Sequence, residues 1–192
     1  MLNLSSYQVI LASRSPRRNE LLKGLGVDFK VMLKETPEDF DPVLSGSEVA
    51  SLLSKRKSEA FEDCDLPENY LLITADTIVW LNGKILNKPA DQEEAFAMLA
   101  ELSGNHHTVY TGVYLRSKHK TVHFCESSEV YFSQLTPEEI WFYIHNYKPF
   151  DKAGAYGIQE WIGYVGINHI EGSYFNVMGL PTQRLYSELC GF

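Results

Sequence analysis

Cysteine is scarce in this 192-residue chain, and Cys64, Cys125 and Cys190 lie far apart in it. No CxxC pair and no Cys/His spacing of a zinc site occurs. Long apolar runs are also missing, since no stretch approaches the ~20 residues of a transmembrane helix. The N-terminal residues lack the pattern of a secretory signal peptide. We therefore expect reduced thiols, a cytoplasmic location and no membrane partner.

An excess of positive charge is absent as well. The chain has 17 Lys and Arg against 25 Asp and Glu, a net charge of -8, whereas general nucleic-acid binders present basic surfaces. It has no GxGxxG, Walker-type or HExxH motif, so dinucleotide, P-loop and zinc-protease functions have no support. Two basic islands, 14–18 and 55–57, suit a small anionic ligand better than a nucleic-acid polymer.

The hydrophobic pattern predicts strands and helices in alternation, without a linker or an internal repeat. We expect strands at 7–12, 28–33, 70–80, 84–86, 106–116, 121–132 and 161–170, with 173–178 extended. Helices are expected at 16–23, 47–64 with Ser47 as the cap, 91–102, 136–146 and 180–189. Because antiparallel hairpins interrupt the alternation, the fold class predicted is α/β with a mixed sheet.

The richest stretch lies between the first strand and the first helix, where the sequence reads Ser-Arg-Ser-Pro-Arg-Arg from position 13. Ser15 suits an N-cap and Pro16 the first helical position. Arg17 and Arg18 then fall in the first turn, where cations are unfavourable unless an anion lies among them. A capped helix start with two arginines after a buried strand therefore indicates a phosphate site, with a solvated helix face as the alternative.

Asp76 interrupts an otherwise apolar strand. A carboxylate there is costly to bury without a partner. It shares one face of the strand with Thr74 and Ile78, while Thr77 points to the other face. Two interpretations remain open: a structural salt bridge, or a role as metal ligand or general base at the end of the sheet. We favour the second.

Two later segments carry weaker signals. Pro89 could fix the backbone that holds Lys88, although an exposed lysine is the plainer interpretation. Residues 151–159 are rich in Gly and Ala, which permits close approach of the backbone to a ligand. Lys152 adds a positive charge there, and the amide of Gln159 can both donate to and accept from a base edge. A glycine-rich turn with a solvated ion pair would explain the same residues.

These segments occur in one order: 11–18, Ala75-Asp76-Thr77-Ile78-Val79, Lys88-Pro89, Leu102-Ser103-Gly104, Thr111-Gly112-Val113, 151–159, Gly172-Ser173-Tyr174 and 177–181. The ordered set resembles the Maf family of nucleoside triphosphate pyrophosphatases, once known as septum-formation inhibitors. The resemblance covers nearly the whole chain. It implies one domain over residues 1–192 with an inosine-triphosphatase-like fold, in which an elongated mixed sheet flanked by helices forms two lobes around a central cleft.

The resemblance also implies an activity: hydrolysis of a nucleoside triphosphate to the monophosphate and pyrophosphate with Mg²⁺ or Mn²⁺. The branch acting on dTTP and UTP is marked by Arg, Thr and Gln, and this chain has Arg17, Thr77 and Gln159 at those points. Asp76 and Glu38 match the family's acidic positions and could supply metal ligands, with Asp76 also the candidate base. The side chains suited to hold the triphosphate are Ser13, Arg17, Arg18, Lys57, Lys88 and Lys152. Because relatives of the fold often form dimers, the resemblance also allows a homodimer.

Three other functions compete with this one. The same basic residues would serve a non-catalytic nucleotide-binding regulator of cell division, in which Asp76 is structural. A phosphohydrolase that cuts at the γ-phosphate would release inorganic phosphate instead of pyrophosphate. A nucleic-acid processing protein is the least favoured, because the chain is acidic.

Overall fold

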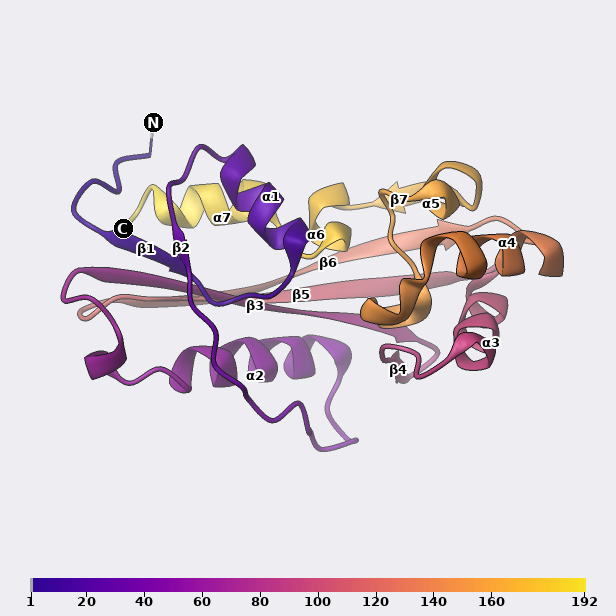
Figure 1. Cartoon of the computed structure of the whole chain (residues 1–192), viewed down its shortest axis with the longest axis horizontal. Coiled ribbons are helices and arrows are strands. Elements are labelled where there is room, and N and C mark those ends of the chain that lie inside the picture. The colour runs from indigo at the N-terminus through magenta and orange to yellow at the C-terminus, as the bar shows by residue number, and fades with distance from the viewer. Residues whose placement is uncertain (1) are drawn as a thin grey trace.

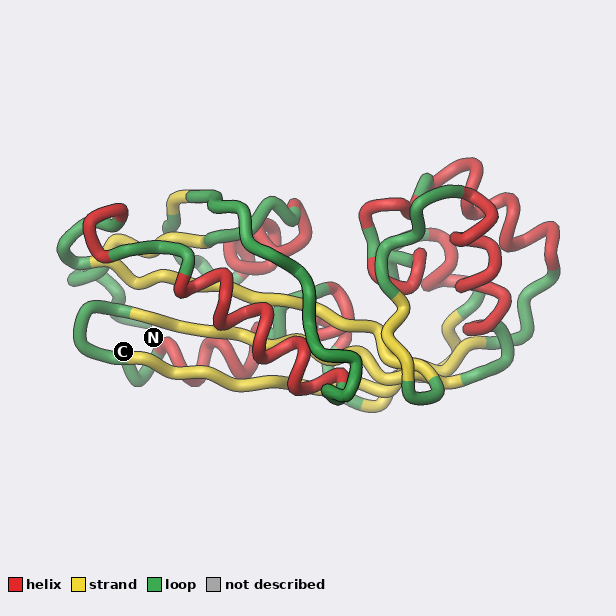
Figure 2. Tube along the Cα trace, turned by 90° about the horizontal axis from the view of Figure 1, so that it is seen from below, coloured by secondary structure: helices red, strands yellow, loops and turns green. Residues whose placement is uncertain are grey.

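The computed structural model describes residues 2–192, through which one mixed sheet of seven strands extends (Figures 1 and 2). Six strands lie side by side in the order β2-β1-β3-β5-β6-β7, and β4 pairs with the second half of β3. Their bounds are β1 Gln8–Leu11, β2 Lys30–Val31, β3 Tyr70–Leu81, β4 Lys84–Leu86, β5 His106–Arg116, β6 Thr121–Phe132 and β7 Ile167–Glu171. Parallel pairing is confined to β1 with its two neighbours, and the other pairs are antiparallel.

Helices cover both faces of this sheet. Helix α2, Gly46–Glu59, packs Val49, Ala50 and Leu53 on one face against Ile78. The opposite face carries α1 Pro16–Gly24, α6 Tyr174–Met178 and α7 Thr182–Leu189 toward one end (Figure 1). Toward the other end, α3 Gln92–Leu102 and α4 Pro137–Tyr147 pack against Val79 and Val109 of that face. The short helix α5, Trp161–Val165, precedes β7, and single 3-10 turns lie at Asp63–Asp65, Pro149–Asp151 and Ala153–Ala155. The elongated α/β fold class predicted from the sequence is confirmed.

One edge of β3 is left open at its centre. Pairing with β1 ends at Leu11 and Ile73, and pairing with β4 begins only at Val79 and Leu86. Within residues 2–192, the segment 74–78 has no strand beside it on that edge, although β5 pairs along the whole of its other edge. This interruption separates the two groups of helices on the α1 side of the sheet.

A glycine lets α2 approach the sheet at the level of this opening. Gly112 of β5 pairs with Asp76 of β3. A Cβ atom at Gly112 would lie 2.3 Å from the carbonyl oxygen of Ala50 in α2. Because that oxygen belongs to rigid backbone, any larger residue would push α2 away from β3 and β5. The distance between α2 and the strand that carries Asp76 therefore depends on Gly112.

Four expected elements differ from those observed. The strand expected at 161–170 is α5 followed by β7, and the segment 173–178 is helical instead of extended. Ser173 accepts the amide of Asn176 at 3.3 Å, and Gly179 ends that turn with a φ of 115°. Single helical turns are too short for hydrophobic periodicity to distinguish from strands, which explains both errors.

The third difference concerns α2, whose cap is Ser45 and not Ser47, and which ends at Glu59 and not at Cys64. Ser45 and Glu48 form a capping box, in which the Ser45 amide donates to Glu48 Oε2 at 2.8 Å. The second strand is also shorter than expected, because only Lys30–Val31 pairs with β1. None of the helices in residues 2–192 has the length and apolar character needed to cross a bilayer.

Candidate active site

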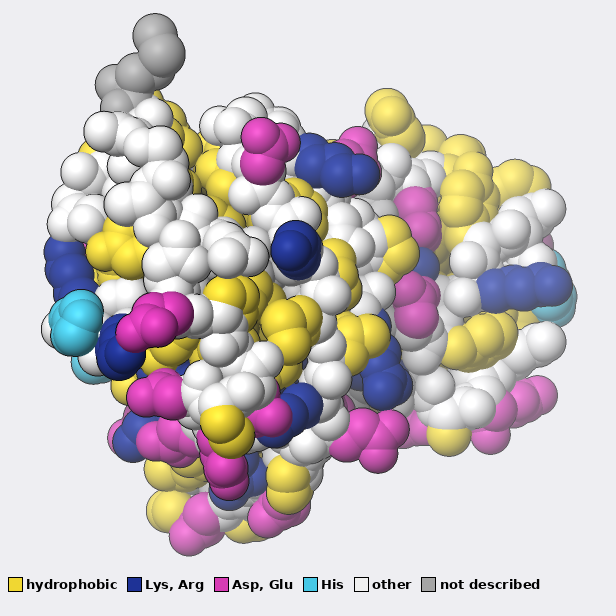
Figure 3. Space-filling model, turned by 60° about the vertical axis from the view of Figure 1, so that its left-hand side comes forward, with side chains coloured by type: hydrophobic (Ala, Val, Ile, Leu, Met, Phe, Trp, Pro, Cys, Tyr) yellow, Lys and Arg dark blue, Asp and Glu magenta, His cyan; other side chains and the backbone are white. Residues whose placement is uncertain are grey.

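A cleft of about 870 Å³ opens where the edge of β3 is unpaired. It is lined from one side by the turn before α1, the loop after β2 and α2, and from the other by the β4–α3 connection and residues 151–159. Lys, Arg, Asp and Glu side chains gather along the hollow between the two halves of the molecule (Figure 3). The ten residues singled out from the sequence all line this cleft: Ser13, Arg17, Arg18, Glu38, Lys57, Asp76, Thr77, Lys88, Lys152 and Gln159.

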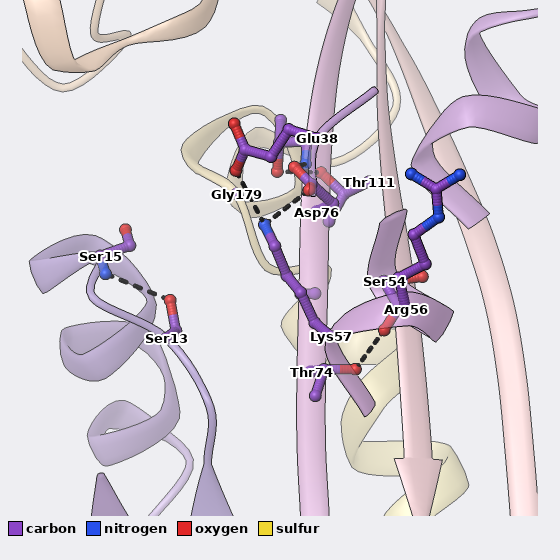
Figure 4. A network of polar contacts seen from close by, with 12 residues as sticks. Ser13, Ser15, Glu38, Ser54, Arg56, Lys57, Thr74, Asp76, Thr111 and Gly179 are labelled. Carbon is purple, nitrogen blue, oxygen red and sulfur yellow. Dashed lines mark hydrogen bonds and ion pairs between the residues drawn. The ribbon is translucent and has the colours of Figure 1, made fainter. Parts of the chain in front are cut away.

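The start of α1 forms one wall as the sequence predicted. Ser13 is buried, and its hydroxyl accepts the amide of Ser15 at 3.1 Å (Figure 4). Ser15 in turn accepts the amide of Arg18 at 3.4 Å, and Pro16 occupies the first position of the helix. The turn therefore brings Arg17 and Arg18 to the cleft in the first turn of a capped helix.

Arg18 replaces the missing strand beside β3. Its Nη1 donates to the carbonyl of Ala75 at 2.8 Å, its Nε to the carbonyl of Gly179 at 2.8 Å, and its Nη2 to the hydroxyl of Thr77 at 2.9 Å. Burial lowers the pKa of Arg18 from its ordinary value, and the Asp76 carboxylate opposes that shift. Since all three nitrogens already have acceptors, Arg18 joins α1, β3 and the turn after α6 in addition to facing the cleft.

Asp76 lies in the middle of β3. The position at the end of the sheet that the sequence had suggested is wrong. Its Oδ1 accepts the amide of Thr77 at 2.7 Å, and its Oδ2 lies 2.6 Å from Lys57 Nζ. The Glu38 carboxylate lies 3.6 Å from the same ammonium, so a single cation is placed between two acids (Figure 4). Asp76 therefore has a salt-bridge partner, as the structural interpretation required. The Lys57 ammonium also brings the carboxylates of Asp76 and Glu38 to one place, as a metal site would require.

Arg56 contacts the loop residues on both sides of Glu38 in the sequence, Pro37 and Asp39. Helix α2 presents Arg56 to the loop after β2, where its Nη1 lies close to the carbonyl and 3.3 Å from the carboxylate of Asp39. The third basic residue of this island, Lys55, pairs instead with Glu59 on the outer side of the helix. Of the island 55–57, only Lys57 enters the cleft.

The opposite wall carries Lys88, Lys152 and Gln159. Lys88 is exposed, and within residues 2–192 it makes no ion pair. The Lys152 ammonium is buried and lies 2.7 Å from the carboxylate of Asp151 and 3.1 Å from that of Glu160. The side-chain oxygen of Gln159 is buried without a hydrogen-bond partner in the described chain. An unpaired buried acceptor costs free energy, which a donor on a ligand would recover.

Sequence reasoning missed Asp151 as the link between the walls. Its Oδ2 lies 3.4 Å from Arg17 Nη1 across the cleft, while its Oδ1 contacts Lys152. Burial acts to raise the pKa of Asp151, but the hydrogen bond from Lys152 and the charges of Lys152 and Arg17 outweigh it and lower the pKa. The signal in the sequence was an acid directly before Lys152, but nothing in the sequence placed it beside Arg17.

The donor set suits a hard divalent cation that also binds substrate oxygens. No group of three or more His, Cys, Asp or Glu side chains arranged to hold a metal ion occurs in residues 2–192. Mg²⁺ is commonly held by one or two carboxylates plus substrate phosphates, which is what Asp76 and Glu38 can offer. The position of the Lys57 ammonium between them shows that the pair already accommodates positive charge.

Comparisons with known proteins show which family the chain belongs to. The model of the Maf-like protein family matches residues 8–192. A protein of Bacteroides thetaiotaomicron named dTTP/UTP pyrophosphatase is 51% identical over 188 residues, 97% of each chain. One of Flavobacterium psychrophilum with the same name is 51% identical over 179 residues, 93% of this chain and 91% of that one. Among solved structures, the Staphylococcus aureus Ham1 protein aligns with 65% of this chain and 71% of its own at 20% identity, with a TM-score of 0.44.

Proposed function

Because this chain belongs to the family of Maf-like proteins, we propose that it is a nucleoside triphosphate pyrophosphatase that hydrolyses dTTP and UTP to the monophosphate and pyrophosphate. The observation that carries the proposal is the cleft, in which Asp76 and Glu38 face cationic side chains from both walls. Relatives that match almost the whole chain bear the name of this activity, which supports the choice of substrate.

The cations of the cleft are suited to a triphosphate. Arg17 comes from α1, Lys57 from α2, and Lys88 and Lys152 from the opposite wall. Each can neutralise charge on phosphate oxygens, and the positive end of the α1 dipole adds to their effect. Electrostatic stabilisation and positioning are the main requirements of phosphoryl transfer chemistry.

The reaction needs a water molecule to attack the α-phosphorus while the bond to the bridging oxygen of the pyrophosphate breaks. Asp76 is the candidate to accept the proton of that water, because its carboxylate lies in the cleft on rigid strand backbone. Asp76 and Glu38 would also hold Mg²⁺ or Mn²⁺, which supplies neutralisation of phosphate charge when bound. Lys57, which pairs with both acids, would also contact phosphate oxygens.

The pyrimidine base is assigned to the side of the cleft that contains Gln159. Its side-chain oxygen is buried and lacks a donor, and the N3–H of thymine or uracil is a donor of the right kind. Thr77 and Arg17 complete the set that marks the dTTP and UTP branch. In this chain the Thr77 hydroxyl is held by Arg18 at 2.9 Å and by Thr111 at 3.0 Å.

The test is a panel of nucleoside triphosphates with Mg²⁺, Mn²⁺ or no metal, scored for monophosphate, pyrophosphate and inorganic phosphate. We expect metal-dependent release of pyrophosphate, fastest from dTTP and UTP. Release of inorganic phosphate alone would indicate cleavage at the γ-phosphate. Nucleotide binding without any product would favour the regulator of cell division.

We also infer a cytoplasmic location and a homodimer as parts of this proposal. All three cysteines are free, which suits a reducing compartment. The homodimer follows from the relatives of the fold that form dimers, and Tyr164 and Phe175, 83% and 46% exposed, offer apolar surface for such a contact. Light scattering of the purified protein tests the dimer, and a mass equal to one chain would reject it.

A further inference from the structure

Two carboxylates hold the Lys152 ammonium in the wall of the cleft, and they differ in exposure. The side chain of Asp151 is 61% exposed, whereas that of Glu160 is 19% exposed. An exposed carboxylate makes a weak, easily exchanged ion pair. An incoming phosphate can therefore replace Asp151, while Glu160 remains as the lasting partner of Lys152.

Glu160 is fixed from behind by Tyr143, a fully buried side chain of α4. The Tyr143 hydroxyl donates to Glu160 Oε2 and accepts the amide of Gly157 at 2.9 Å. Burial, together with the Glu160 carboxylate, raises the pKa of Tyr143 far above its ordinary value, so the phenol keeps its proton. Both oxygens of Glu160 thus have partners, the phenol on one and the ammonium on the other.

Gly157 is the point at which this network meets the ligand-facing side chains. A Cβ atom there would lie 2.9 Å from Glu160 Cδ, 3.0 Å from Lys152 Cε and 3.1 Å from Gln159 Nε2. The three side chains therefore pack around one backbone position, which Tyr143 holds through the Gly157 amide. A displacement of Glu160 is transmitted to Lys152 and Gln159 together, since close-packed groups move only jointly.

We propose that Glu160, braced by Tyr143, is a positioning residue that sets Lys152 and Gln159 as one unit. Glu160 is absent from the lining of the cleft as described for residues 2–192, so it acts through these two neighbours. Lys152 serves the phosphate end and Gln159 the base end. A single substitution outside the cleft should therefore disturb triphosphate binding and base selectivity at once. The inference rests on the proposed function for the identity of the ligand.

The experiment measures the two ends separately. Binding of inorganic tripolyphosphate without metal, followed by calorimetry, reports the phosphate end and needs no turnover. The ratio of kcat/KM for dTTP to that for dATP reports the base end. The variants are Glu160→Gln, which removes the charge, and Tyr143→Phe, which keeps the charge but removes the brace. Tyr147→Phe is the matched control, because Tyr147 lies one turn along α4 and stacks on Tyr143 at 5.2 Å without entering the network.

We expect Glu160→Gln and Tyr143→Phe each to weaken tripolyphosphate binding about 10-fold, the size typical of a lost charge-assisted hydrogen bond. Each should also lower the dTTP to dATP ratio, while Tyr147→Phe changes neither. Glu160→Asp retains the charge but is too short to reach both partners, and should fall between wild type and Glu160→Gln.

The opposite sign would overturn the proposal. If Glu160 acts only as a nearby negative charge, its removal tightens tripolyphosphate binding and leaves the base ratio unchanged. Unchanged values in a folded Glu160→Gln variant reject the positioning role as well, even if Tyr143→Phe fails to fold. Failure of the proposed function shows separately, as absence of pyrophosphate release by the wild-type protein, and the tripolyphosphate titrations still decide the role of Glu160.

Discussion

The Lys57 ammonium lies 2.6 Å from the carboxylate of Asp76, in the middle of the strand that forms the floor of the cleft. This ion pair is only partly exposed, with side-chain exposures of 20% and 13%. The lysine therefore neutralises Asp76 in the ligand-free protein. A divalent cation at Asp76 has to share the carboxylate with Lys57 or displace it.

Removal of this lysine should strengthen metal binding in the absence of nucleotide. In Lys57→Ala, the ammonium no longer competes for Asp76 and Glu38, so we expect Mn²⁺ affinity to rise at least ~3-fold. Titration followed by electron paramagnetic resonance measures the free Mn²⁺. Lys55→Ala is the control, because Lys55 pairs with Glu59 outside the cleft. Unchanged or weaker Mn²⁺ binding in Lys57→Ala would place the metal elsewhere.

Asp76→Asn should lower kcat for dTTP by at least ~10²-fold if the carboxylate accepts the proton of the attacking water. Pyrophosphate release measures this loss. A Mn²⁺ titration of the same variant then separates the two roles, since retained metal affinity with lost turnover assigns the base, and loss of both assigns the ligand. Glu35→Gln is the control, an exposed acid at the rim that pairs with Arg14. Near-normal turnover in Asp76→Asn would refute the assignment.

The resemblance to the family marks Arg17, Thr77 and Gln159 as the selectivity set, and a triple variant tests them. Arg17→Trp, Thr77→Gln and Gln159→Glu together should weaken hydrolysis of dTTP and UTP, because the matching donors and acceptors are lost. Rates across a panel of purine and pyrimidine nucleoside triphosphates measure the change. Asp151→Asn controls for the broken contact between the walls, since it removes the partner of Arg17 without altering the set. An unchanged ranking of substrates would remove the claim.

Gly112→Ala should destabilise the fold by about 1–3 kcal/mol, because the new methyl group would meet the Ala50 carbonyl at 2.3 Å. Chemical denaturation measures the free energy of unfolding. Gly24→Ala at the end of α1 is the matched control, as a Cβ atom there meets no other atom within 4 Å. Equal stability of the two variants would show that α2 can move away from the sheet at no cost.

The buried His107 should make stability depend on pH. Its Nε2 lies 2.7 Å from the hydroxyl of Tyr156, and burial lowers its pKa from the ordinary 6.5 to about 3. Between these values the unfolded chain binds the proton and the folded chain does not. The free energy of unfolding therefore falls as pH is lowered from about 6.5, by up to about 1.4 kcal/mol per pH unit.

Denaturation curves at pH 7, 6 and 5 test this dependence. His107→Gln should show a flatter loss of stability than the wild type, because it has no proton to gain. His119→Gln, at an exposed position in the loop between β5 and β6, should follow the wild type. Parallel slopes for His107→Gln and wild type would contradict the role assigned to burial.

The sequence predicted the long elements well because their signals are local. Both strands of the hairpin at 106–132 have the expected bounds, and Pro16 and Thr136 mark helix starts as expected. The single-turn helices α5 and α6 were assigned wrongly, since one turn carries no measurable periodicity. The position of Asp76 was predicted wrongly for another reason. Asp76 is accessible because β1 stops pairing with β3 at Ile73, and the sequence of β3 alone does not show where its neighbour ends.

The sequence identified the residues that line the cleft, from their types and their order in the chain. It did not predict which of them contact one another. Arg17 and Asp151 are 134 positions apart, and Tyr143 and Glu160 belong to different elements. Contacts of this kind depend on tertiary packing, which local sequence patterns do not encode.

The open edge of β3 has a consequence for the chain in a crowded cell. Uncovered strand edges offer their amides and carbonyls to foreign polypeptides, which is a common route to edge-to-edge aggregation. In this protein the Arg18 guanidinium occupies the carbonyl of Ala75, and the Asp76 carboxylate occupies the amide of Thr77. A strand from another molecule would therefore find these two backbone groups already hydrogen-bonded. The side chains that shape the cleft thus also protect the open edge of β3 from self-association.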